Sequence, residues 1–111
     1  VIDEKIFDSY SKGTDMIRTF IFPGGLLPSI EKIEQSLKKV GMKISNKEFF
    51  GKDYATTLDS WDEKFIAKEQ ELIELGFDQR FQRMWRFYLN SCSAAFINGR
   101  IDVVQLEIVH A

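Results

Sequence analysis

Apolar side chains recur every three or four residues in four stretches of the chain, the spacing typical of helices. The stretches predict one or two helices between residues 6 and 22, and further helices over about 30–40, 53–75 and 78–97. Residues that commonly end helices follow each stretch, namely Pro23, Gly41, Gly76 and the pair at 98–99. The pattern therefore predicts about four helices.

Two other segments have the pattern of strands. Met42 and Ile44 alternate with polar residues, which predicts a strand over 42–50, and a segment rich in β-branched residues predicts a strand over 101–109. This second strand is apolar on both faces around Val104, as in a strand that is covered on both sides. Because two strands alone rarely make a stable sheet, we expect the sheet to continue with strands outside these residues.

Composition removes several classes of function. The chain has 111 residues, a net charge of −2, one cysteine and one histidine. That charge does not favour a nucleic-acid partner. Cys92 cannot form an intrachain disulfide, and with His110 as the only histidine a Ser-His-Asp triad or a histidine-based metal site is not expected. The position of Cys92 on an apolar helical stripe favours unreactive core packing.

Charged residues on the predicted helices can be surface groups or candidates for a site. Carboxylates such as Asp59 and Asp62 are typical of solvated helix faces. Arg80, Arg83 and Arg86 are spaced by three, so they lie roughly along one side of a helix. They could form surface or interface ion pairs, or face lipid phosphates.

Tyr54 follows the predicted strand over 42–50, at its junction with the next helix. A side chain at such a junction can project into a cleft, and a neutral phenol can donate a hydrogen bond to an anion. Periodicity alone also allows Tyr54 to be the first residue of a buried stripe.

Three blocks, taken in order, resemble one family: FIFPGGLLPS, FFGKDYATTLDSW and ELGFDQRFQRMWRFYLNSCSAAFINGRIDVVQ. They are similar to the C-terminal part of cyclopropane-fatty-acyl-phospholipid synthases and of the related mycolic acid cyclopropane synthases. The resemblance implies a class I S-adenosylmethionine-dependent methyltransferase fold, which is an α/β fold with a seven-stranded, mostly parallel sheet. Residues 1–111 would then be an α+β piece of that domain, with about four helices and its last two, antiparallel strands. The cofactor-binding half would lie upstream.

The resemblance also implies a reaction. Family members transfer a methyl group from S-adenosylmethionine to a cis double bond of a phospholipid acyl chain, and the resulting cation loses a proton and closes to a cyclopropane. Bicarbonate is thought to act as the base. In the family, a motif tyrosine contacts the bicarbonate, and the resemblance places Tyr54 at that position. Cys92 and His110 do not match the cysteine and histidine that also contact the bicarbonate in the family.

The turn at residues 20–29 places two glycines between two prolines, among apolar residues. Proline fixes the backbone and glycine permits close approach, so the turn is expected to be rigid. We expect Phe22, Leu26 and Leu27 either to line the acyl-chain channel or to pack under the rim of the sheet.

The expected partners are phospholipid acyl chains, the membrane surface, reached peripherally, and the N-terminal part of the same polypeptide. The expected location is the cytoplasm, at the inner face of the membrane. Two alternatives remain open. The parent could methylate another acceptor without ring closure, or the chain could be a non-catalytic helical domain that binds lipid or protein.

Calorimetric titration of residues 1–111 with S-adenosylmethionine tests the expectation that the cofactor-binding half lies upstream. The glycine loop that holds this cofactor in the family belongs upstream, so we expect no binding by the isolated residues and no turnover. Tight binding would contradict the assignment of these residues to the C-terminal part.

Overall fold

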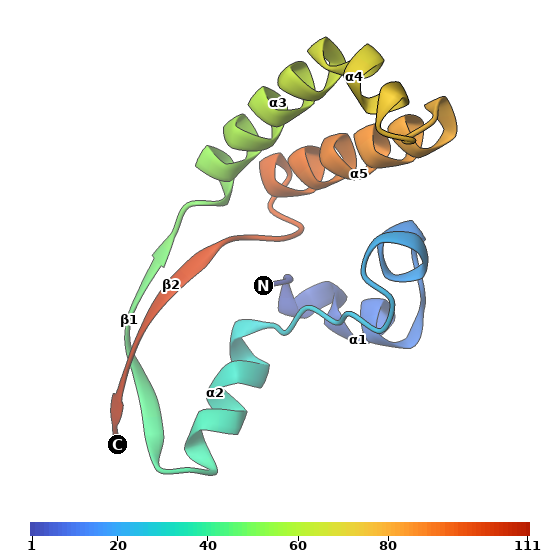
Figure 1. Cartoon of the computed structure of the whole chain (residues 1–111). Helices are drawn as coiled ribbons and strands as arrows, with labels where there is room; N and C mark the ends of the chain where they lie inside the picture. The colour runs from blue at the N-terminus through green and yellow to red at the C-terminus, as the bar shows by residue number, and fades with distance from the viewer.

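Eight elements follow one another in the computed structural model, which describes residues 1–111 (Figure 1). They are α1 (Glu4–Lys12), the π-helical turn η1 (Ile17–Ile21), α2 (Ile30–Lys38), β1 (Met42–Phe49), α3 (Gly51–Ala67), α4 (Glu69–Glu74), α5 (Gln79–Ile97) and β2 (Val104–His110). Both predicted strands are present, and the helices of the second and fourth stretches lie where the pattern placed them.

The predicted number of about four helices is too low. The structure has five α-helices and the π-helical turn, because the first stretch holds two helices, as the pattern allowed, and the third divides, which the pattern did not predict. The chain leaves α1 at Gly13, and η1 then closes with a hydrogen bond of 2.7 Å from the Phe22 amide to the Ile17 carbonyl.

The helix predicted over 53–75 breaks at Lys68 into α3 and α4. No proline or glycine marks this break. The Gln82 side chain of α5 instead donates hydrogen bonds to the Glu69 carbonyl, at 3.3 Å, and to the Phe77 carbonyl, at 3.0 Å. The Glu69 carbonyl at the bend thus accepts a hydrogen bond from a side chain thirteen residues away along the chain. The periodicity of apolar residues cannot reveal such a contact.

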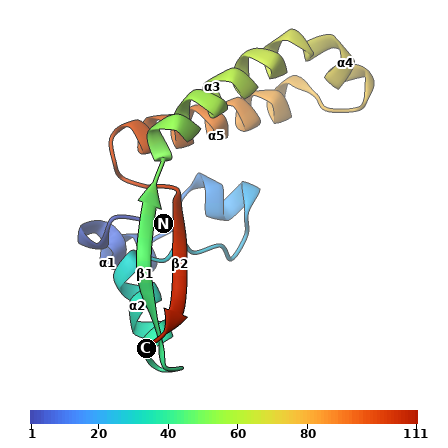
Figure 2. The same cartoon turned by 90° about the vertical axis from the view of Figure 1, so that its left-hand side faces the viewer.

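Helices α3 and α5 pack side by side as an antiparallel hairpin (Figures 1 and 2). Four buried side chains form its core, namely Ala55, Leu58, Leu89 and Phe96. Polar contacts join the helices beside the core: the Ser93 hydroxyl donates to Asp59 Oδ1 at 2.6 Å, and Arg86 pairs with Asp62.

Strands β1 and β2 form a two-stranded antiparallel ribbon with α2 against β1. Ile44 pairs with Ile108 and Phe49 with Val104, and the register shifts at Ser45. The second strand begins later than predicted, because Ile101 forms an isolated bridge with the buried Ile2.

The chain as a whole is elongated, as Figure 2 shows, with extents of 53 × 28 × 25 Å. Its radius of gyration is 17.0 Å, whereas a compact domain of this length would have about 13 Å. Only 9 of 111 residues are buried. Much of the apolar surface is therefore uncovered within these residues. None of the helices is both long and apolar enough to cross a membrane.

The hairpin core predicts the effect of a truncation at Leu58, which is only 2% exposed. In the full-length protein that carries these residues, Leu58→Ala should lower the free energy of unfolding by about 2–5 kcal/mol through lost burial and a residual cavity. Denaturant unfolding measures the change. Glu63→Ala is the matched control, because Glu63 is an exposed charged residue of the same helix and its truncation should cost less than about 0.5 kcal/mol. Equal losses would show that the hairpin is not packed as described.

Candidate functional site

Tyr54 lies in the first turn of α3, directly after the strand-to-helix junction where the sequence placed it. Its ring is half-buried and packs edge-on against Phe96, with ring centroids 5.2 Å apart, and against Trp61, at 5.9 Å. Its hydroxyl makes no hydrogen bond within the chain, and no buried side-chain oxygen or nitrogen lacks a partner. The phenol is therefore held by its ring, while its hydroxyl is free to donate.

Tyr88 of α5 lies close to Tyr54, and Cys92 lies close to Tyr88. Tyr88 and Cys92 are one helical turn apart, so both point to the same face. Burial raises the pKa of the Tyr88 phenol, and charge on Cys92 or Tyr54 raises it further. Burial also raises the pKa of the Cys92 thiol, with an added effect from the Asp15 carboxylate. Both groups are thus neutral at pH 7, which agrees with the prediction that Cys92 is unreactive.

The N-terminal segment contributes Asp15 to this neighbourhood. The Arg18 side chain donates to Asp15 Oδ2 at 3.0 Å and to the Tyr10 carbonyl at 2.8 Å, and its guanidinium lies 4.0 Å from the centre of the Tyr10 ring. Asp15 Oδ1 also accepts the Arg18 amide at 2.8 Å. Asp15 is therefore held by Arg18.

Only part of the apolar turn at residues 20–29 lies beside Tyr88. Phe22 packs edge-on against Tyr88, with ring centroids 5.9 Å apart. Leu26 and Leu27 are exposed, and the Leu27 amide donates to the Tyr10 hydroxyl at 2.9 Å. The predicted role of Phe22, Leu26 and Leu27 in an acyl-chain channel stays a prediction.

Neither Tyr88 nor Asp15 is singled out as a site residue by the sequence. The spacing of Tyr88 and Cys92 was a usable signal that they share a face, but no sequence signal placed that face against Tyr54. Together, Tyr54, Tyr88 and Phe22 form a cluster of aromatic rings, and both tyrosine hydroxyls lack a hydrogen-bond partner within the chain. Such a cluster can bind an apolar group while offering a hydrogen bond to a small anion.

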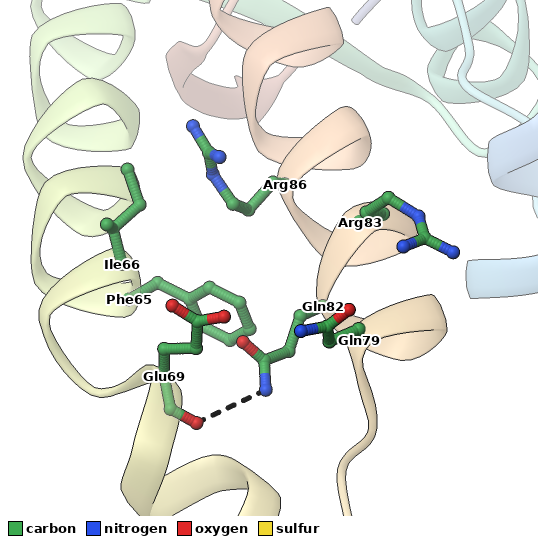
Figure 3. Close-up of a pocket in the computed structure, with 7 residues that line it drawn as sticks. All are labelled: Phe65, Ile66, Glu69, Gln79, Gln82, Arg83 and Arg86. Carbon is green, nitrogen blue, oxygen red and sulfur yellow. Dashed lines mark hydrogen bonds between the residues drawn. The ribbon is translucent and has the colours of Figure 1, made fainter.

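A separate pocket of about 250 Å³ lies where α3 ends and α5 begins (Figure 3). The residues that line it are Phe65, Ile66, Glu69, Gln79, Gln82, Arg83 and Arg86. Figure 3 shows the guanidinium of Arg83 turned away from α3. The mixed charges of this lining indicate no single ligand, and Tyr54 is not part of it.

Arg86 forms a two-pronged ion pair with Asp62 across the hairpin, at 2.9 and 3.2 Å. The hydrogen bond from Arg86 holds the pKa of Asp62 below its ordinary value of 3.8. The interpretation of Asp62 as a solvated carboxylate is thus wrong, because the antiparallel packing of α5 places a guanidinium beside it. Ion pairing, one of the two interpretations of the arginine row, holds for Arg86. No cluster of three residues suited to a metal ion is present.

A sequence profile of the mycolic acid cyclopropane synthetase family matches residues 2–106. The chain belongs to this family. It is 41% identical over 101 residues to the cyclopropane-fatty-acyl-phospholipid synthase of Escherichia coli K12, covering 86% of this chain and 26% of that protein. It is 39% identical over 94 residues to the tuberculostearic acid methyltransferase UfaA1 of Mycobacterium tuberculosis, covering 84% and 22%.

Solved structures agree with the sequence comparison. The cyclopropane synthase MmaA2 from Mycobacterium tuberculosis superposes with a TM-score of 0.79 at 33% identity, covering 84% of this chain and 32% of that one. The mycolic acid cyclopropane synthase CmaA1, solved with SAH and CTAB, also gives a TM-score of 0.79, at 32% identity and the same coverage. The chain thus spans about a fifth to a third of the length of these relatives.

The pair of Asp62 and Arg86 predicts a pH-dependent contribution to stability. Because the pKa of Asp62 is lowered in the folded state, its ionisation stabilises the fold above pH 3.8, and this contribution is lost as the pH falls through the lowered pKa. Asp62→Asn in the full-length protein should lower the melting temperature at pH 7 by at most a few degrees, since the pair is partly exposed.

The difference between Asp62→Asn and wild type should shrink as the pH falls below the ordinary aspartate value. Thermal unfolding at several pH values measures it. Glu63→Gln is the control, because Glu63 is exposed and forms no ion pair. A difference that persists unchanged in acid would show that the ionised pair is not its source.

Proposed function

We propose that residues 1–111 are the C-terminal part of a methyltransferase catalytic domain that forms cyclopropane rings on lipid acyl chains. The family match over residues 2–106 carries this proposal. The coverage of only 22–32% of the relatives supports the view that an N-terminal part of the same polypeptide completes the domain. The antiparallel pair of β1 and β2 fits the last two strands of a class I methyltransferase sheet.

The proposed reaction transfers a methyl group from S-adenosylmethionine to a cis double bond of a phospholipid acyl chain, leaving a methylene bridge. The matches to an E. coli synthase that acts on phospholipids and to a structure solved with SAH support these assignments. No residue of this chain is assigned to S-adenosylmethionine. The chemistry that this cofactor supplies is the methyl group itself.

Tyr54 is proposed to orient bicarbonate, which would supply the base that removes the proton. The residues present fit such an anion, because the Tyr54 hydroxyl has no partner within the chain and its ring is fixed against Phe96 and Trp61. A neutral phenol donates to the anion without adding charge to it. The hydrogen bond would hold one oxygen of the anion in a defined direction.

The aromatic rings around Tyr54 are proposed to exclude water from the reacting carbon atoms. A cation that forms on the acyl chain must be shielded from water, and aromatic faces stabilise positive charge. Phe22 and Tyr88 supply rings on one side of the cluster. Leu26 and Leu27 would continue this apolar surface toward the acyl chain, which the protein would reach peripherally at the cytoplasmic face of the membrane.

A second candidate keeps the fold and omits ring closure. The match to the tuberculostearic acid methyltransferase UfaA1 favours it, because that relative is named for methylation. Analysis of lipids from cells that express the full-length protein separates the two. A cyclopropane product supports the first candidate, and a methyl-branched product supports the second.

Tyr54→Phe tests the role of the hydroxyl in the full-length enzyme. The substitution keeps the ring contacts and removes only the donor, so turnover should fall by on the order of 10²-fold through misplacement of the anion. The bicarbonate concentration that gives half of the maximal rate should rise. Transfer of labelled methyl to lipid measures both.

Tyr88→Phe is the matched control for Tyr54→Phe. The proposal uses only the ring of Tyr88, so this variant should retain turnover within about threefold of wild type. Unchanged turnover in Tyr54→Phe would reject the role of its hydroxyl.

A further inference from the structure

The junction between β1 and α3 is held by a residue fifty-one positions away along the chain. Asp102 Oδ1 accepts the Gly51 amide at 2.8 Å and the Val103 amide at 2.9 Å. The Phe50 amide also donates to the Val103 carbonyl at 3.0 Å. These bonds join the start of α3 to the segment that leads into β2.

Asp102 takes the place of a local cap. The residue before α3 is Phe50, whose side chain cannot accept a hydrogen bond, so the first amide of the helix has no acceptor from its own segment. A carboxylate at this position satisfies that amide and interacts favourably with the positive end of the helix. The helix therefore begins at a position set by Asp102.

Only glycine fits at residue 51 beside this carboxylate. A Cβ atom there would lie 2.4 Å from Asp102 Oδ1, 3.2 Å from Asp102 Cα and 3.1 Å from Cδ1 of Phe96. The first distance is far below van der Waals contact, and one of the neighbours is backbone. Close approach, rather than an unusual backbone angle, thus explains this glycine.

The same contacts lead directly to Tyr54. The Tyr54 amide donates to the Phe50 carbonyl at 3.2 Å, which is the first helical bond after the junction. The Tyr54 ring packs against Phe96, and the Phe96 ring also lies beside the position that a Cβ atom would occupy at Gly51. A shift at Gly51 would therefore reach Tyr54 both through the backbone and through the Phe96 ring.

We infer that Asp102 and Gly51 are positioning residues that fix the direction of the Tyr54 phenol. This inference rests on the proposed function, in which the Tyr54 hydroxyl orients bicarbonate. Asp102 does not touch the anion in this proposal. It acts by fixing the first turn of α3, and a displacement of about 1 Å at a catalytic group can cost on the order of 10²-fold in rate.

The test is a double-mutant cycle on the full-length protein that carries these residues. Asp102→Ala and Asp102→Asn are each made with Tyr54 intact and in the Tyr54→Phe background. The readouts are the rate of methyl transfer, the bicarbonate concentration for half of the maximal rate, and the melting temperature. A residue that acts only through Tyr54 should lose its effect when the Tyr54 hydroxyl is absent.

With Tyr54 intact, Asp102→Ala should lower turnover about 10-fold and raise the bicarbonate requirement, whereas in the Tyr54→Phe background it should cost less than about twofold. Asp102→Asn keeps an oxygen acceptor, so its loss should stay within about threefold and should likewise vanish in that background. If Asp102→Ala does not fold, the double-mutant cycle is measured with Asp102→Asn alone.

Asp53→Ala is the matched control. Asp53 is an exposed carboxylate in the same first turn, and its side chain makes no hydrogen bond. Its removal should leave the bicarbonate requirement unchanged. Equal losses for Asp102→Ala in both backgrounds would overturn the inference, as would a loss in Asp102→Asn as large as that in Asp102→Ala.

A readout without turnover separates this inference from the proposed function. Fluorotyrosine is incorporated, and the fluorine resonance of Tyr54 is identified by its loss in Tyr54→Phe. The resonance should shift or broaden in Asp102→Asn or Asp102→Ala and remain unchanged in Asp53→Ala. A protein that transfers no methyl group would refute the proposed function, while an unmoved Tyr54 resonance would refute the positioning role.

Discussion

The carboxylate of Asp102 joins the two halves of this structure, because the hairpin and the ribbon meet where it binds the Gly51 and Val103 amides. Without these bonds, α3 would begin after a residue that offers no cap. The bonds demand an unusually close approach, which only glycine at residue 51 allows. The direction of the helical hairpin relative to the ribbon thus depends on the Asp102 side chain and on the absence of a side chain at Gly51.

The aromatic residues serve packing and the site at the same time. Phe96 belongs to the small hairpin core, and its ring also packs edge-on against Tyr54. Few side chains are buried in these residues, and large apolar ones such as Phe20 and Phe87 are exposed. In the proposed full-length domain, the rest of the polypeptide would cover these side chains, so a thin core within residues 1–111 fits that proposal.

Local chemistry was enough to locate several elements and one residue of the candidate site. The Ser29 side chain caps α2 and the Asp78 side chain caps α5, as residues of their type commonly do. The position of Tyr54 followed from the end of a strand and the start of a helix. The break at Lys68 could not be predicted from local chemistry, because the Glu69 carbonyl at that bend accepts a hydrogen bond from Gln82 of another helix.

The sequence by itself determined which segments are helices or strands, and the order of its motifs determined the family, since periodicity and caps are local and motifs are read along the chain. Tertiary structure decided that Tyr88 lies beside Tyr54, that Asp62 pairs with Arg86, and that Asp102 reaches Gly51. Each of these contacts joins residues far apart in the sequence. Their distances depend on how α3 and α5 pack and how the ribbon turns, and no local pattern encodes that geometry.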